Sequence, residues 1–179
     1  MRPLAPAAGL LLAASLLPAC SASPAGPQPA APTYRLPPRT VRPGEQAVQP
    51  AYAASGDVSF TVIGLTTGMP ELVGSHADIP AKGRFVRIRV IVANTGRNTV
   101  SIRTARQRLI DDHGRVYAPD HNAMLIKRQP DELRLGSAMR IEFDLWYDIP
   151  ATARPRALRV SGAAALTGRP PDADLPLPS

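Results

Sequence analysis

The stretch RFVRIRVIVAN, residues 84–94, decides the fold class of this chain of 179 residues. Its side chains alternate between an aliphatic set and a set that mixes two arginines with apolar residues. Such period-two alternation is typical of a β-strand with one face in a core and the other face partly in solvent. We expect an inward set of Val86, Ile88, Val90 and Val92, and an outward set of Phe85, Arg87, Arg89 and Ile91.

The same alternation recurs through the central part of the chain. Turn-forming residues in NTGRN, 94–98, and in DDHGR, 111–115, separate the alternating segments. About seven short strands without a convincing helix predict an all-β antiparallel sandwich. Shorter strand candidates lie at residues 57–65, 99–103, 107–111, 115–118 and 156–162. In AMRIEFDLWYDIP, residues 138–150, we expect Met139, Ile141, Phe143, Leu145 and Tyr147 inward and Arg140, Glu142, Asp144 and Trp146 outward.

The N-terminal segment indicates export. Arg2 precedes an uncharged Leu/Ala run, which is typical of a secretory signal and shorter than the ~20 residues of a spanning helix. The run ends in Leu17-Pro18-Ala19-Cys20, which resembles the bacterial lipobox. The resemblance implies cleavage after Ala19, acylation of Cys20 and a durable anchor on the outer face of the cell membrane, or on an outer membrane. Release with a free thiol and an uncleaved anchor remain alternatives.

Composition divides the chain into four parts. Residues 1–19 are the expected lipoprotein signal peptide, and residues 20–54 form a Pro/Ala-rich linker with few large apolar side chains. Such a linker cannot bury enough apolar area to fold, so we expect a disordered, extended spacer. Residues 55–162 are long enough for one core, and residues 163–179 resemble the linker and predict a disordered tail. Cys20 is the only cysteine, so this core has no internal disulfide.

The central segment also resembles a known family. Its motifs, in order, are Gly83, Phe85, Asn94 and Gly96 on one strand, Leu109, Asp111 and Gly114 in a hairpin, and Gly136, Tyr147, Asp148 and Pro150 on a later strand. The order and spacing are similar to the immunoglobulin-like domain that many exported bacterial lipoproteins carry, catalogued as a domain of unknown function. It is similar, more distantly, to a small secreted mycobacterial immunoprotective antigen. The resemblance implies an immunoglobulin-like sandwich and an export compartment, and it implies no reaction.

Catalytic motifs are absent from the sequence. It contains no glycine-rich phosphate loop, no His-Glu-x-x-His, no Gly-x-Ser-x-Gly and no cysteine pair with metal spacing. We therefore expect no enzyme and no cofactor. Copper binding is the alternative, because methionine and imidazole are suitable copper ligands. The candidate ligands are His121, Met124, His76 and Met69, although Met124 packed under a loop and an exposed His121 explain the same residues.

Charge and exposed apolar residues suggest a binding surface. The chain carries a net charge of +7, nearly all of it from arginine. Arg87, Arg89 and Arg103 fall on outward strand faces, where they form a candidate surface with Trp146 for an envelope protein, acidic glycan or lipid headgroup. The alternatives are plain solubility for the arginines and burial under a second sheet or loop for Trp146. We expect no nucleic-acid partner, since the chain is exported and has no reading helix.

Overall fold

The computed structural model describes residues 40–49, 51–74, 77–163 and 168–178. Within these ranges the chain forms ten strands, one short α-helix and one 3-10 turn at Thr104–Arg106. The elements in chain order are β1 (Ala51–Ser55), β2 (Val58–Leu72), β3 (Ile79–Asn94), β4 (Val100–Arg103), β5 (Arg108–Asp111), β6 (Val116–Tyr117), α1 (His121–Ile126), β7 (Glu132–Leu135), β8 (Arg140–Ile149), β9 (Pro155–Val160) and β10 (Ala173–Pro176).

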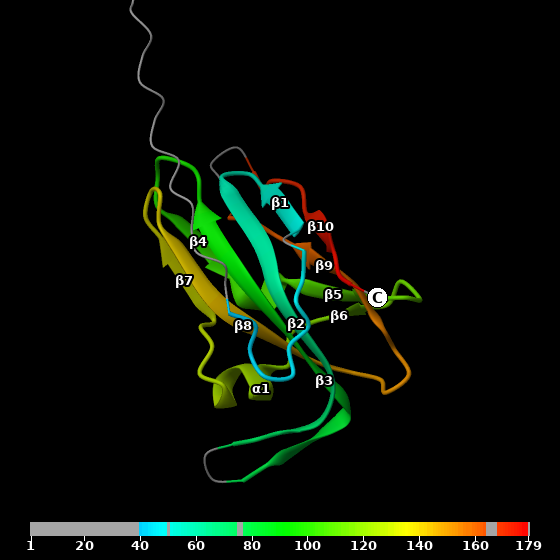
Figure 1. Ribbon diagram of the computed structural model, residues 1–179. Helices are drawn as coiled ribbons and strands as arrows, with labels where there is room; N and C mark the ends of the chain where they lie inside the picture. Colours follow the sequence, from blue (N-terminus) through cyan, green and yellow to red (C-terminus); the bar gives the residue numbers. More distant parts are fainter. Residues whose placement is uncertain (1–39, 50, 75–76, 164–167, 179) are drawn as a thin grey trace, which may run out of the picture. The chain divides into compact units, whose positions relative to one another are not determined.

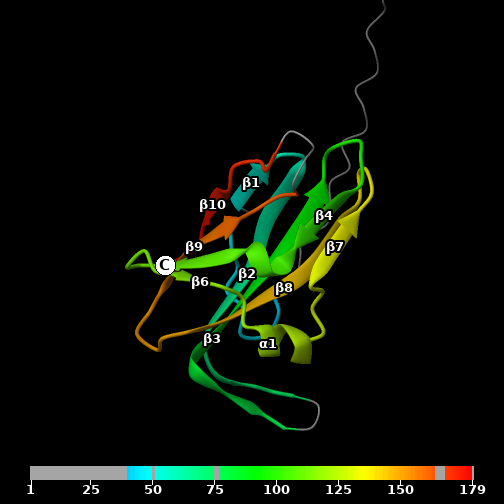
Figure 2. The ribbon, with the colours of Figure 1, turned by 180° about the vertical axis from the view of Figure 1, so that it is seen from behind.

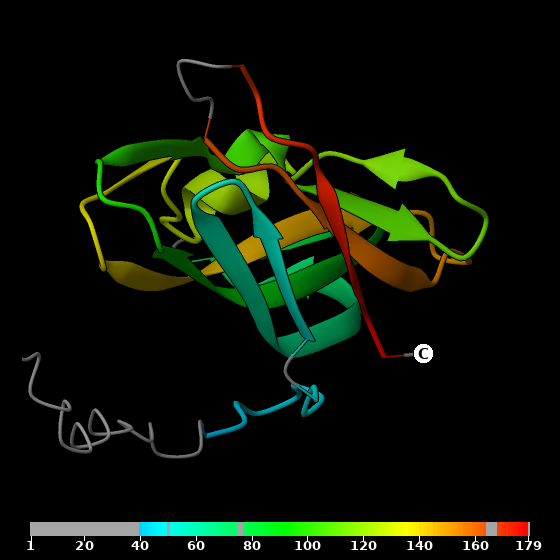
Figure 3. The same ribbon diagram turned by 90° about the horizontal axis from the view of Figure 1, so that it is seen from above.

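Two four-stranded antiparallel sheets form the domain. Their strand orders are β1-β2-β3-β8 and β10-β9-β5-β6, and a small third sheet pairs β4 with β7. Figure 1 and Figure 2 show the two larger sheets from opposite sides, and Figure 3 shows them from above. The predicted all-β, immunoglobulin-like antiparallel sandwich is confirmed, and each of the seven predicted segments contains a strand. Three further strands, β1, β7 and β10, lie in stretches too short or too rich in Ala and Pro to show alternation.

The longest hairpin joins β2 to β3. Its register runs from Val58 opposite Asn94 to Leu72 opposite Ile79, with irregularities after Val62, Thr66 and Met69. The hairpin extends beyond the rest of the sheet, as Figure 1 shows at the bottom of the view. Most of the segment 66–83 is therefore strand rather than loop.

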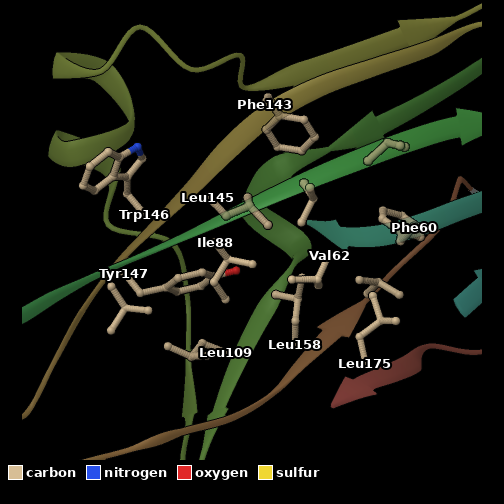
Figure 4. Close-up of a cluster of buried hydrophobic side chains, with 14 of the residues drawn as sticks. Phe60, Val62, Ile88, Leu109, Phe143, Leu145, Trp146, Tyr147, Leu158 and Leu175 are labelled. Carbon is tan, nitrogen blue, oxygen red and sulfur yellow. The ribbon is translucent and has the colours of Figure 1, made fainter. Parts of the chain in front are cut away.

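The core lies between the two larger sheets. Figure 4 shows Phe60, Val62 and Ile88 of the first sheet facing Leu109 and Leu158 of the second. Each of these side chains is at most 1% exposed. Burial of one such side chain contributes about 2 kcal/mol, so this layer is the main source of stability. The predicted inward set of β3 is confirmed, with the same near-complete burial of Val86, Ile88, Val90 and Val92.

The prediction for β8 is correct only from Phe143 onward. Phe143, Leu145 and Tyr147 are buried, as expected. Met139 and Ile141, expected inward, are 54% and 37% exposed. Alternation indicates which face of a strand a residue occupies, but it does not indicate where along the strand the opposite sheet ends.

The C-terminal segment is part of the sandwich. The prediction of a disordered tail at 163–179 is wrong for β10, which pairs antiparallel with β9 and places Leu175 opposite Leu158. Leu175 is fully buried, and the backbone N–H of Leu177 donates to the carbonyl of Arg156 at 2.8 Å. Two inward leucines among prolines and aspartates are too few to show a strand pattern, which explains the error.

The helix α1 is short and begins at a side-chain cap. The Asp120 carboxylate accepts a hydrogen bond from the backbone N–H of Ala123 at 2.8 Å, which satisfies one of the free donors of the first turn. The helix buries Ala123 and Met124, and the N–H of Asp120 donates to the carbonyl of Trp146 on β8. Within the described ranges, no helix is both long and apolar enough to cross a membrane.

Tyr147 provides a test of the core. Its side chain is fully buried, burial raises its pKa above the usual value near 10, and its hydroxyl has no hydrogen-bond partner among the described residues. Because an unpartnered buried hydroxyl is destabilising, we expect Tyr147→Phe to increase the free energy of unfolding by about 1 kcal/mol. Urea unfolding followed by circular dichroism measures this change.

Tyr117→Phe is the matched control. The Tyr117 hydroxyl donates to the Asp111 carboxylate at 2.8 Å, so its removal should lower stability instead. A loss of stability in Tyr147→Phe would show that the buried hydroxyl has a partner after all.

Candidate functional site

Residues 40–49, which we call the strap, lie beside the outer face of the first sheet (Figure 1, blue to cyan). The strap turns at Pro43-Gly44, where Gly44 has a φ of +72° and the N–H of Glu45 donates to the carbonyl of Arg42 at 3.0 Å. Proline followed by glycine suits a type II turn. Gln46 then forms a bridge to Leu65 of β2. The predicted disordered linker 20–54 is therefore wrong for the strap and for β1.

A buried ion pair fastens the strap. The Arg89 guanidinium donates from Nε to Oε1 of Glu45 at 3.0 Å and from Nη2 to Oε2 at 2.6 Å. The two side chains are only 6% and 1% exposed. Nη2 of Arg89 also donates to the carbonyl of Thr40 at 3.1 Å. This two-pronged geometry is the strongest form of an arginine–carboxylate contact.

Gly64 on β2 makes room for the ion pair. A Cβ atom at this position would lie 2.0 Å from Oε1 of Glu45, which is far inside contact distance. The register of β2 on β3 also shifts between Val62 and Gly64. Glycine is thus required here because the Glu45 carboxylate lies close to the backbone of β2, and any side chain would displace it.

Four further side chains extend the pair into what we call the outer-face ion network. Arg42 contacts Asp144 at 2.9 Å and Glu142 at 3.4 Å, and Arg89 contacts Glu142 at 3.1 Å. Arg87 lies 3.8 Å from Glu45. Among the described residues, the network contains three arginines and three carboxylates, which are Arg42, Arg87, Arg89, Glu45, Glu142 and Asp144.

The network corrects the predicted basic surface. Arg89 is 5% exposed, and its charge is paired, so it cannot attract a partner as a free cation. The Arg87 side chain is 16% exposed and donates to the Thr66 hydroxyl. Arg103 is exposed, as expected, but it lies on β4 of the small third sheet, whereas the other two arginines lie on β3 of the first sheet. The candidate surface of Arg87, Arg89 and Arg103 is therefore wrong as a continuous patch.

Trp146 is also buried. Its side chain is 5% exposed, with the Arg87 guanidinium 5.8 Å and the Lys127 ammonium 5.5 Å from the ring centroid. Both distances allow cation–π attraction. Figure 4 shows the ring beside α1, which covers this face of the sheet. The expectation that Trp146 belongs to an exposed binding surface is wrong, and the alternative of burial is correct, because the outer face of the sheet has its own cover.

The four candidate copper ligands do not form a common site in the part of the chain that the structure describes. Met124 is 3% exposed within the core, His121 is exposed at the start of α1, and Met69 is half-buried on β2. His76 lies outside the described residues. Burial of Met124 agrees with the packing alternative for this residue.

The DDHGR turn is organised by a buried carboxylate. Asp111 accepts hydrogen bonds from the N–H of His113 at 2.9 Å, the N–H of Arg115 at 2.8 Å and the Tyr117 hydroxyl at 2.8 Å. Burial raises the pKa of Asp111, but these hydrogen bonds and the Arg115 charge outweigh it and hold the pKa below 3.8. Asp111, Asp112 and His113 lie close enough to hold a metal ion. The oxygens of Asp111, however, are already used by the turn.

A groove of about 650 Å³ opens at one end of the sandwich. It lies where the strap, β2, the β5–β6 turn, the start of β9 and the C-terminal segment meet. Arg154 and Arg156 supply its positive charge, and neither guanidinium has an ion-pair partner among the described residues. Its lining consists of Gln46, Thr67, Asp112, Arg154, Pro155, Arg156, Leu177 and Pro178.

Residues 51–169 match the family described as a domain of unknown function (DUF4352). The chain belongs to this family. The DUF4352 match begins at the first residue of β1, so the strap lies outside it. The match ends at residue 169, before β10 begins. No curated protein matches the chain.

Two solved structures are similar to this DUF4352 chain. The yjhA protein of Bacillus subtilis has a TM-score of 0.52 at 16% identity, and the match covers 71% of this chain and 96% of that one. A conserved hypothetical protein from Bacillus anthracis has a TM-score of 0.46 at 14% identity, with coverage of 66% and 89%. The likeness to the B. subtilis protein shows a shared fold.

Sequence reasoning missed Glu45 and the two groove arginines. The signal for Glu45 was RPGE, residues 42–45, a turn motif with the one acidic residue of a linker whose other charged residues are arginines. Arg154 and Arg156 flank Pro155 at a strand start, but nothing local distinguishes them from other surface arginines. Only the fold places them beside the strap and the C-terminal segment.

Glu45→Gln tests the ion network. The substitution keeps the shape of the side chain but removes the charge of the closer and more buried of the two carboxylates that Arg89 contacts, so we expect a loss of about 3 kcal/mol in the free energy of unfolding. Urea unfolding measures the loss. Glu71→Gln, at an exposed position on β2, is the control and should change stability little. Equal effects of the two substitutions would show that the strap is not fastened by this pair.

Asp111→Asn tests the turn carboxylate through pH. The folded protein holds the pKa of Asp111 below its usual value, so its stabilising effect is present above that value and is lost as pH falls through the folded pKa. The stability difference between wild type and Asp111→Asn should therefore be large at pH 7 and shrink below about pH 4. Urea titrations across this range measure it, with the exposed Asp131→Asn as a control; a difference independent of pH would contradict the assignment.

Proposed function

We propose that this DUF4352 chain is an extracytoplasmic lipoprotein, held on the outer face of the membrane by acylated Cys20. Its immunoglobulin-like domain binds an envelope protein or glycan and catalyses no reaction. The observation that carries the anchoring is the sequence Leu17-Pro18-Ala19-Cys20 at the end of an uncharged run. Ala19 and Cys20 lie outside the described residues, so this support comes from the sequence.

The position of the strap refines the expected spacing between anchor and domain. The carbonyl of Thr40 accepts a hydrogen bond from the Arg89 guanidinium, so the domain already includes residues that precede the predicted first residue, Ser55. The spacer that we propose between Cys20 and the domain is therefore shorter than the expected linker, residues 20–54.

A binding role is supported by the groove. Ligand sites are concave, combine an apolar lining with a few polar groups, and usually occupy 300–1,000 Å³, a range that includes this groove of about 650 Å³. The sequence offers no nucleophile–base motif that would support catalysis. The copper-carrier alternative has weaker support, because Met124 is buried in the core and His121 is exposed at the surface of α1.

Replacement of Cys20 tests the anchor. Expressed in a bacterial host that processes lipoproteins, the wild-type chain should partition into the detergent phase and carry the added mass of its acyl chains. Cys20→Ala should remain in the aqueous phase without that mass, because it lacks the acceptor thiol. Ser23→Ala, three residues away, is the control and should behave as wild type. Equal partitioning of wild type and Cys20→Ala would rule out lipidation at this residue.

A further inference from the structure

The groove at the end of the sandwich contains arginine where the core would otherwise continue. Alternate residues of β9 share a face, and Leu158 and Val160 are fully buried on the face toward the first sheet. Arg156 lies two residues before Leu158, beside a shift in the register of β5 on β9, and it is exposed in the groove. The space between the sheets is thus apolar at its centre and cationic at this mouth.

The charge of the groove is not neutralised from within. Among the described residues that line it, Arg154 and Arg156 are the two cationic side chains and Asp112 is the one acid. The Asp112 carboxylate accepts from the N–H of Arg154 at 3.3 Å and contacts Nδ1 of His113 at 2.9 Å. The outer-face arginines, by contrast, are all paired with carboxylates. A net positive charge therefore remains for a ligand.

The same lining offers apolar surface and neutral polar groups. Pro155, Leu177 and Pro178 form the apolar part, and Leu177 is 9% exposed. Gln46 of the strap and Thr67 of β2 contribute an amide and a hydroxyl. This combination suits a molecule with an anionic group at one end and an apolar group at the other.

The groove is held in place by backbone hydrogen bonds. The N–H of Leu177 donates to the carbonyl of Arg156 at 2.8 Å, and the N–H of Asp112 donates to the carbonyl of Arg154 at 2.9 Å. Gln46 is fixed by its bridge to Leu65. A lining ordered before binding lowers the entropy cost of binding.

We propose that this groove binds an anionic amphiphile, with its phosphate or carboxylate against Arg154 and Arg156 and its apolar group against Pro155, Leu177 and Pro178. The arginine guanidinium matches both anions with paired hydrogen bonds. The inference rests on the proposed binding role of the domain and goes beyond it, because a small amphiphile is neither an envelope protein nor a glycan.

Titration with hexyl phosphate tests the proposal. The full chain carries Cys20→Ala, so that no acyl chain can compete with hexyl phosphate for the groove. Calorimetry should give saturable binding of one molecule. Hexanoate should also bind, whereas inorganic phosphate and hexanol should each bind at least about tenfold more weakly, since each lacks half of the recognised structure. Backbone amide NMR shifts should concentrate at the start of β9 and at Leu177.

Two substitutions at exposed arginines complete the test. Arg156→Gln should weaken hexyl phosphate binding about tenfold or more, as expected for the loss of a charge-assisted hydrogen bond. Arg134→Gln, at an exposed position on β7, should leave binding unchanged. Equal weakening by both, equal affinity for inorganic phosphate, or NMR shifts outside the groove would each overturn the proposal. None of these outcomes depends on whether Cys20 is acylated, which the detergent partitioning decides separately.

Discussion

The ion pair between Arg89 and Glu45 determines how the first sheet is covered. The desolvation of two buried charges costs more free energy than that of a pair at the surface. A buried pair is stable only if its geometry is good and further hydrogen bonds offset this cost. This cost is offset here by the bidentate contact and by the hydrogen bond to the carbonyl of Thr40. Gly64 leaves the space that the pair needs. As a result the strap covers one face of β3, while the second sheet covers the other.

The sequence predicted the sandwich well because its inward positions are so uniform. Val86 and Ile88 follow a strict alternation, and the structure buries them both. The same alternation failed for Arg89 and Trp146, since an outward position is exposed only if nothing else covers it. Glu45 lies 44 residues from Arg89 in a stretch whose composition suggests a spacer, so local pattern could not reveal the cover.

The groove was beyond prediction for a related reason. Its lining comes from the strap, β2, the β5–β6 turn, β9 and the C-terminal segment, which meet only after the two sheets have packed. The turn at Asp111 was predictable, because a short acidic and glycine-containing segment specifies its own geometry. The charge of Arg156 could be read from the sequence, but its position at the mouth of the inter-sheet space could not. The same holds for β10, whose pairing with β9 depends on two leucines.

Trp146 is the only tryptophan of the chain, and it lies where α1 meets the first sheet, between the charges of Arg87 and Lys127. The tryptophan fluorescence of this protein therefore originates at a single place, on the face of β8 that meets α1. This fluorescence reports whether α1 and the neighbouring cations remain packed against β8. A detached helix would change the emission while the inter-sheet layer stayed intact, which makes the local and global openings of this domain optically separable.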